Sequence, residues 1–345
     1  MNKPSFDGLD RDHRTTKNEN SQLAESHSRN FQSKDKKKPA VGGQAVIEGV
    51  MMRSPFAVAT AVRNPAGDIV IDKFPFVSLS KKSKFWGLPI LRGAVALGEA
   101  MYLGVKTLNW SASIAAEEDG QAAKPLSFKE KLISVLTMIF AFGAGMGIFM
   151  YIPYLTAGFI RDASGSQFLF HAVAGAIRIG LFLLYLYLIS LWSEIRRVFE
   201  YHGAEHKSIF AFEITGEADV NKAAEYPRLH PRCGTSFLLI TAVIVIFLFA
   251  ILDSILVPLI GEFSSPLHRL AIHLPFIPLV AGVSYEVLRF SGEKRENRLW
   301  KQLIKPGLWL QHIMTREPDA SQLEVAVAAL ESSLNPDFQP KADVE

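Results

Sequence analysis

The chain has 345 residues, of which 49% are hydrophobic, and a formal net charge of +3 at pH 7. Its mean hydropathy is positive, which argues against an ordinary water-soluble globular protein and makes membrane lipid the expected surroundings. The net charge is too small to indicate a nucleic-acid-binding protein, and the sequence contains no basic patch with interleaved aromatic residues.

The chain begins with a polar segment followed by a small β module. Residues 1–40 are rich in Ser, Asn, Asp and Lys, cannot bury a core and are predicted to be disordered. No stretch among them resembles a cleavable signal peptide. In the module, residues 41–77, the β-prone runs 57–63 and 69–76 are separated by turn-forming residues at 64–68. This pattern predicts a hairpin within a small cytoplasmic antiparallel sheet.

An amphipathic helix is predicted at 86–110. Arg92, Glu99 and Lys106 recur every seven residues and form one narrow charged stripe on an otherwise apolar cylinder. Such a helix lies in the membrane interface or packs against the cytoplasmic ends of membrane-spanning helices. A further span is disfavoured, because each charge costs about 2.5–3.5 kcal/mol at the bilayer centre.

Four apolar segments are long enough to cross a bilayer core, which needs about 20 helical residues. They lie at 133–155, 172–192, 236–256 and 270–288. The predicted fold is therefore an α-helical polytopic membrane protein with about four transmembrane helices. The second of these helices is expected to continue without a break past Trp192 to residue 212.

Lysine and arginine predict the orientation in the membrane. The loop 193–235 contains six of them, and the region 289–345 is also basic. By contrast, Arg161 and Arg269 are the only ones in the connections after the first and third spans. The positive-inside rule then places both termini and the loop in the cytoplasm, with the chain in the inner membrane.

The region after the last span, 289–345, is predicted to form cytoplasmic helices and a loose tail. A short amphipathic helix is expected from Pro306 to near Thr315. The spacing of Ser321 and Glu324 matches a capping box, so a final helix capped by Ser321 is expected to reach about Ser333.

The loop contains an H-x-x-E-H pattern formed by His202, Glu205 and His206. On a helix, the two histidines project from one face about a turn apart and could hold one metal ion. In the inverted-zincin arrangement, a glutamate at this position polarises a metal-bound water as a general base. Packed histidines at helical spacing are the alternative explanation.

A second cluster, His230 and Cys233, follows in the same loop. Cys233 is the only cysteine, so its thiol cannot form an internal disulfide. Three histidines and one thiol within a short stretch form a donor set suited to Zn²⁺, which prefers imidazole and thiolate ligands. The expected ligands are therefore His202, His206, His230 and Cys233.

Three further polar residues are candidates for the same site. Glu48 and Arg53 interrupt an apolar run, although outward-facing strand positions explain them equally well. Glu286 lies near the cytoplasmic end of the fourth span, where carboxylates are costly and usually functional, with Arg289 as a structural partner. Arg178 and Asp253 lie near outer ends of spans, where solvation is easy, and carry no predicted function.

Several of these motifs together resemble those of the YqhQ-like family, a bacterial family of largely uncharacterised membrane proteins described as predicted metal-dependent enzymes. The resemblance is carried in collinear order by residues 42–53, 200–207, 230–237 and 284–286. It extends from about Pro39 to Pro318. It implies a membrane protein with a metal-dependent activity, and it names no substrate.

The preferred functional hypothesis is a zinc-dependent hydrolase at the cytoplasmic membrane face, with Glu205 as the base. Four protein donors would close the tetrahedral shell, whereas catalysis needs an open position. A metal-stapled scaffold or assembly factor without activity is therefore the first alternative. A transporter is the second, and it is less favoured because the sequence has no internal repeat and only four spans.

Overall fold

The computed structural model describes residues 38–116, 128–164, 167–230, 236–293 and 298–335. Near the N-terminus lies a four-stranded antiparallel sheet with its strands in sequence order. The strands are β1 (Gly42–Val46), β2 (Gly49–Arg53), β3 (Val58–Arg63) and β4 (Ile69–Phe74). The predicted antiparallel sheet is thus confirmed, and the expected hairpin is β3–β4. The polar segment 1–37 lies outside the described residues.

A tight turn joins β1 to β2. Glu48 occupies this turn with φ 51°, a left-handed conformation that is uncommon for residues other than glycine. Gly49 follows because a Cβ at this position would lie 2.1 Å from the carbonyl oxygen of Ala61 on β3. The turn therefore places the Glu48 carboxylate at one end of the sheet.

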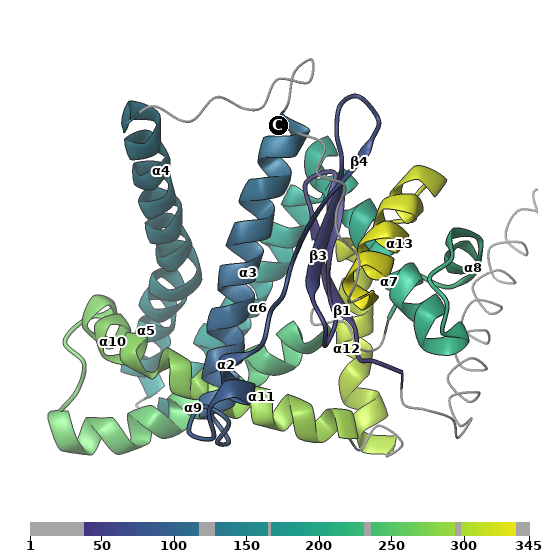
Figure 1. The fold of residues 1–345 in the computed structure, drawn as a ribbon. Helices are drawn as coiled ribbons and strands as arrows, with labels where there is room; N and C mark the ends of the chain where they lie inside the picture. The colour runs from purple at the N-terminus through teal and green to yellow at the C-terminus, as the bar shows by residue number, and fades with distance from the viewer. Residues whose placement is uncertain (1–37, 117–127, 165–166, 231–235, 294–297, 336–345) are drawn as a thin grey trace, which may run out of the picture.

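Helices cover both faces of the sheet (Figure 1). On one face, Met51, Val58 and Val62 pack against Leu103 of α3 (Leu91–Ala115). On the other face, residues of β2 and β3 form one core with α7 (Ser193–Thr215), the short α8 (Val220–Glu225) and α13 (Ala320–Leu334). The sheet is thus the centre of a three-layer unit built from distant parts of the chain.

The predicted amphipathic helix is α3, and it begins at Leu91 rather than at residue 86. Its charged stripe contacts protein: Glu99 lies 3.5 Å from Arg53, and the Lys106 ammonium lies 3.3 Å from the centre of the Phe74 ring. Arg92 pairs with Glu286 of α11 (Ile277–Glu293). The stripe therefore fixes α3 to the sheet and to a neighbouring helix. The short α2 (Leu79–Lys82) precedes it.

The remaining helices are mostly apolar. They are α4 (Phe128–Met146), η2 (Gly147–Tyr151), α5 (Ile152–Ser164), α6 (Gln167–Ile189), α9 (Ser236–Ile260), α10 (Pro266–His273), η3 (Leu274–Phe276), α11 (Ile277–Glu293) and α12 (Arg298–Met314). Among the described residues, three helical stretches are long and apolar enough to cross a membrane: Val135–Phe159, Leu169–Ile189 and Pro266–Val287. The third predicted span, 236–256, lies in α9, whose stretch Ile244–Ile260 is apolar but shorter than those three.

The expected continuous helix through residue 212 is wrong, because α6 ends at Ile189 and α7 begins at Ser193. At the break, Trp192 has an extended backbone conformation with ψ 136°. After this break, α7 packs against the sheet. The histidines therefore lie on a helix that packs against the sheet rather than on a rigid extension of α6.

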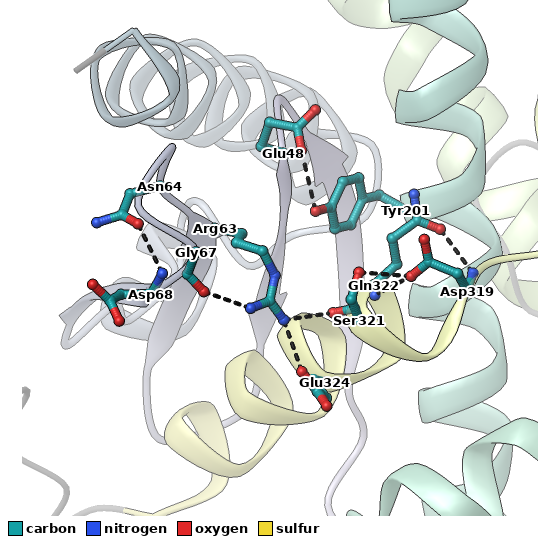
Figure 2. A network of polar contacts seen from close by, with 10 residues as sticks. All are labelled: Glu48, Arg63, Asn64, Gly67, Asp68, Tyr201, Asp319, Ser321, Gln322 and Glu324. Carbon is teal, nitrogen blue, oxygen red and sulfur yellow. Dashed lines mark hydrogen bonds and ion pairs between the residues drawn. The ribbon is translucent and has the colours of Figure 1, made fainter. Parts of the chain in front are cut away.

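The predicted starts of the last two helices need correction. The helix expected from residue 306 is α12, which already begins at Arg298. The final helix is capped by Asp319 rather than Ser321, and Gln322 completes a capping box by accepting from the Asp319 N–H (Figure 2). The capping box therefore begins two residues before the predicted one.

Candidate functional site

The central part of α7 is enclosed on all sides. His202, Glu205 and His206 are 9%, 5% and 1% exposed. Between them Gly203 faces the backbone after α12, where an added Cβ would lie 1.9 Å from the Arg316 carbonyl oxygen. The Arg316 N–H donates to the Phe199 carbonyl at 2.8 Å. Close contact at a glycine thus seals the motif on this side.

Both histidines of the motif have a defined orientation. His202 Nδ1 lies 2.8 Å from the carbonyl oxygen of Met314, and His206 Nδ1 lies 2.5 Å from that of Arg228. A carbonyl only accepts, so each Nδ1 carries the proton and each Nε2 of the neutral rings has a lone pair. A carbonyl on Nδ1 is the usual support for an imidazole that binds a metal through Nε2.

The two rings are also electrically neutral at pH 7. Burial lowers the pKa of His202, and burial together with the neighbouring His202 and His230 lowers the pKa of His206 further. The ring centres lie 4.4 Å apart. His206 Nε2 is buried and has no hydrogen-bond partner among the described residues. Buried polar atoms are rarely left unsatisfied, so this lone pair requires an explanation.

Glu205 is a second buried group without full hydrogen bonding. Burial raises the pKa of its carboxyl to about 8, so the protonated form is favoured at pH 7 in this state. Its Oε2 has no partner among the described residues. The side chain packs against Gly43 of β1, where an added Cβ would lie 2.8 Å from Glu205 Cγ. Sequence reasoning missed this role of Gly43, for which the glycine pair at 42–43 was the only signal.

His230 lies beside the motif, with its ring centre 5.9 Å from that of His206. Gln311 of α12 holds its backbone through two 2.9 Å hydrogen bonds, one from the His230 N–H and one to its carbonyl. The His230 ring itself contacts Glu213, with 3.3 Å between Nε2 and Oε2. Cys233 lies outside the described residues, as does the rest of 231–235.

The described residues provide some, but not all, of the ligands that a metal ion needs. Among the residues that the structure describes, no group of three or more His, Cys, Asp or Glu side chains is arranged to hold a metal. His202 and His206 provide two oriented imidazoles, one of which has an unpartnered lone pair. The two imidazoles alone provide part of a coordination shell.

The structure does not bring Glu48, Arg53 and Glu286 to the histidine pair. Glu48 accepts from Arg197 and, at 3.4 Å, from the Tyr201 hydroxyl (Figure 2). Burial, followed by the Glu48 charge, raises the pKa of Tyr201. Glu48 therefore joins the sheet to the first half of α7, outside the buried motif.

Of the other two candidates, Arg53 lies between the sheet and α3, and Glu286 lies where α11 meets α3. Arg53 pairs with Glu99 and lines a groove of about 530 Å³ between the sheet and α3. Gly43 also lines this groove, so it contacts both the groove and Glu205. Glu286 is bound by Arg92, whose Nε donates at 2.6 Å. Its main partner is thus Arg92 of α3 rather than the expected Arg289.

Comparison with known proteins identifies the family but not the activity. The family described as "Protein of unknown function (DUF1385)" matches residues 88–336. The chain belongs to this family. It is also 34% identical over 313 residues to "Uncharacterized protein YqhQ" of Bacillus subtilis (strain 168), covering 88% of this chain and 94% of that protein. No solved structure matches. The DUF1385 match includes α7 with its histidines, whereas the sheet precedes it.

Proposed function

We propose that this DUF1385 protein is a membrane protein that binds a divalent metal, Zn²⁺ by donor chemistry, through His202 and His206. The supporting observation is the buried His206 Nε2, which has no partner among the described residues while its Nδ1–H is fixed by the Arg228 carbonyl. His230 and Cys233 are the proposed further donors, since imidazole and thiolate are the ligands that Zn²⁺ prefers.

The proposed activity is hydrolysis at the cytoplasmic membrane face, with Glu205 as general base. A bound Zn²⁺ supplies Lewis acidity at such a site. A cation beside Glu205 would counter the effect of burial and favour its ionised form. Glu205 could then accept a proton at Oε2, the oxygen without a partner among the described residues. The surrounding protein would exclude bulk water from this transfer.

Metal analysis of the purified full-length protein tests this proposal. We expect about one metal ion per chain in the wild type and less than a tenth of that in His206→Ala and in the His202→Ala, His206→Ala double variant. Glu205→Gln should keep the metal and lose any hydrolytic activity. His268→Ala is the matched control, because His268 is an exposed histidine on α10. Metal-free wild type that takes up no Zn²⁺ would contradict the proposal.

A metal-stapled scaffold is the second candidate, and the burial of the motif favours it. All three motif side chains are less than a tenth exposed, so this conformation gives a substrate no direct access. X-ray absorption separates the two candidates by ligand count. Four protein ligands indicate a structural site, whereas three with one exchangeable position indicate an enzyme.

A further inference from the structure

A second buried polar cluster lies among the apolar helices, away from α7. It consists of Tyr154, His171, Asp253, Arg269 and His273, none of which is more than 3% exposed. The three candidate membrane-spanning stretches and the shorter apolar helix Ile244–Ile260 each contribute to it. Asp253 was expected to be solvated near a membrane surface, and its complete burial corrects that expectation.

Asp253 is the centre of this cluster. Its Oδ2 lies 2.7 Å from His171 Nε2, and its Oδ1 lies 2.5 Å from His273 Nε2. Arg269 adds an ion pair, with 3.3 Å between Nη1 and Oδ2. The Tyr154 hydroxyl lies 2.8 Å from His273 Nδ1. Asp253 of α9 therefore links α6 and α10 directly, and His273 extends the network to Tyr154 of α5.

Two histidines and one arginine bind the same carboxylate, which is more than a single ion pair uses. Ionisable side chains within membrane helices are costly, and they commonly mark ion or proton pathways. Apolar residues of similar size often replace a buried ion pair without loss of stability. The cluster is therefore a candidate functional site in its own right.

The two histidines differ in access. His273 uses both ring nitrogens, one on Asp253 and one on Tyr154, and its ring stacks on Phe249 at 4.5 Å. His171 binds Asp253 through Nε2, which leaves Nδ1 to take up a proton. His171 also lines a hollow of about 240 Å³ between α6 and α9, which is otherwise apolar. Of the two rings, His171 is the accessible one.

The surrounding charges act on His171 in opposite directions. The negative charge of Asp253 Oδ2, 2.7 Å from His171 Nε2, favours an added proton, whereas the positive charge of Arg269, 3.3 Å from the same oxygen, opposes it. The charges of Asp253 and Arg269 cancel each other, so neutral histidines leave the five residues without net charge. Arg178 lies further away, with Cζ 5.3 Å from the Tyr154 ring and its Nε on the Phe149 carbonyl. Because these charges act in opposite directions, His171 can both bind and release a proton.

We propose that this cluster is a proton-binding site, in which His171 loads and releases a proton at the hollow between α6 and α9. A hydronium ion that reaches His171 loses one O–H bond and leaves as water, while a new N–H bond forms at Nδ1 and the Nε2–H hydrogen bond to Asp253 remains. The positive charge of the site rises by one, and release reverses the step.

Histidine-labelled full-length protein in lipid nanodiscs provides the test, by ¹⁵N NMR between pH 8 and pH 4.5. We expect one buried histidine to change from the neutral ring to the imidazolium, and His171→Gln should remove that signal. Asp253→Asn should lower the midpoint of this signal by about one pH unit or more, since an adjacent opposite charge shifts such equilibria by about 1–3 units.

Two further variants keep the test decisive if Asp253→Asn does not fold. Arg269→Gln removes the opposing charge and should raise the midpoint. His268→Gln removes an exposed histidine on the same helix as His273 and should leave the midpoint unchanged. The proposal is overturned if His171 stays neutral over the whole range, or if its midpoint is the same in wild type and Arg269→Gln.

Discussion

At position 203, one absent methyl group determines how closely α7 approaches the segment after α12. An added Cβ would lie 1.9 Å from the Arg316 carbonyl oxygen, which is backbone and cannot turn away. We expect Gly203→Ala to lower the unfolding free energy by about 2 kcal/mol or more, as overpacking commonly does. Thermal unfolding in a fixed detergent measures this.

Gly98→Ala on α3 is the matched control, because nothing lies within 4 Å of its added Cβ. Alanine is favoured over glycine in a helix by about 1 kcal/mol, so this variant should be unchanged or slightly more stable. Equal losses of stability in Gly203→Ala and Gly98→Ala would show that close packing at Gly203 is unimportant.

At the scale of single residues, the sequence predicted the spacing of side chains along one helix better than it predicted which distant residues are in contact. The positions of His202 and His206 on one face follow from helical periodicity alone. The contacts of Gly43 with Glu205, and of His171 with Asp253, join residues far apart in the chain. Periodicity within one segment carries no information about such pairs.

Among the elements, the start of α13 depends on its cap. The Asp319 carboxylate accepts from the Gln322 N–H at 2.9 Å. Asp319→Ala should cost about 1 kcal/mol of stability, a typical value for loss of an N-cap. Ser321→Ala, which keeps this bond, should cost clearly less. A larger loss of stability in Ser321→Ala than in Asp319→Ala would instead support Ser321 as the N-cap.

The Asp319 cap also predicts how the stability of the protein depends on pH. Burial raises the pKa of Asp319, but hydrogen bonds from Ser321 and Gln322 outweigh it, and the net pKa is lowered. A lowered folded-state pKa means that this stabilisation is present above the unfolded value of about 3.9 and is lost as pH falls below it. The stability difference between wild type and Asp319→Asn should therefore shrink on acidification, as unfolding at pH 6 and pH 3 would show.

Element types followed from sequence, whereas breaks between elements did not. Turn-forming residues at 64–68 marked the β3–β4 hairpin, because their chemistry is local. The break between α6 and α7 falls at Ser190–Trp192, within a largely apolar run. Nothing local distinguishes this break from a continuing helix, and packing of α7 on the sheet determines it.

For the whole molecule, the Arg92–Glu286 pair joins the sheet unit to the apolar helices through α3 and α11. Both side chains are about a quarter exposed, so solvent screens the pair in part. Glu286→Arg should destabilise the protein by about 1 kcal/mol or more, because it places two like charges together. The double exchange Arg92→Glu, Glu286→Arg should recover most of the loss in thermal unfolding. No recovery would mean that the pair does not hold the two parts together.

The proposed orientation in the membrane can be tested with single cysteines in a Cys233→Ser background. Lys82 and Ser264 are both exposed and lie on opposite sides of the predicted topology. A membrane-impermeant maleimide should label Lys82→Cys only in inside-out vesicles and Ser264→Cys only in right-side-out vesicles. The reverse pattern would invert the topology and place α7 outside the cytoplasm.

Coverage of the sheet by α13 has a consequence for biosynthesis. The ribosome completes the strands early, whereas Leu323, Val325 and Ala326, which pack with Val50 and Met52, are among the last described residues to be translated. Throughout elongation, the nascent sheet lacks this cover and requires shielding by a chaperone or by another part of the chain. A stop codon before residue 320 would leave it uncovered permanently, so such truncated products should be substrates for cellular proteases.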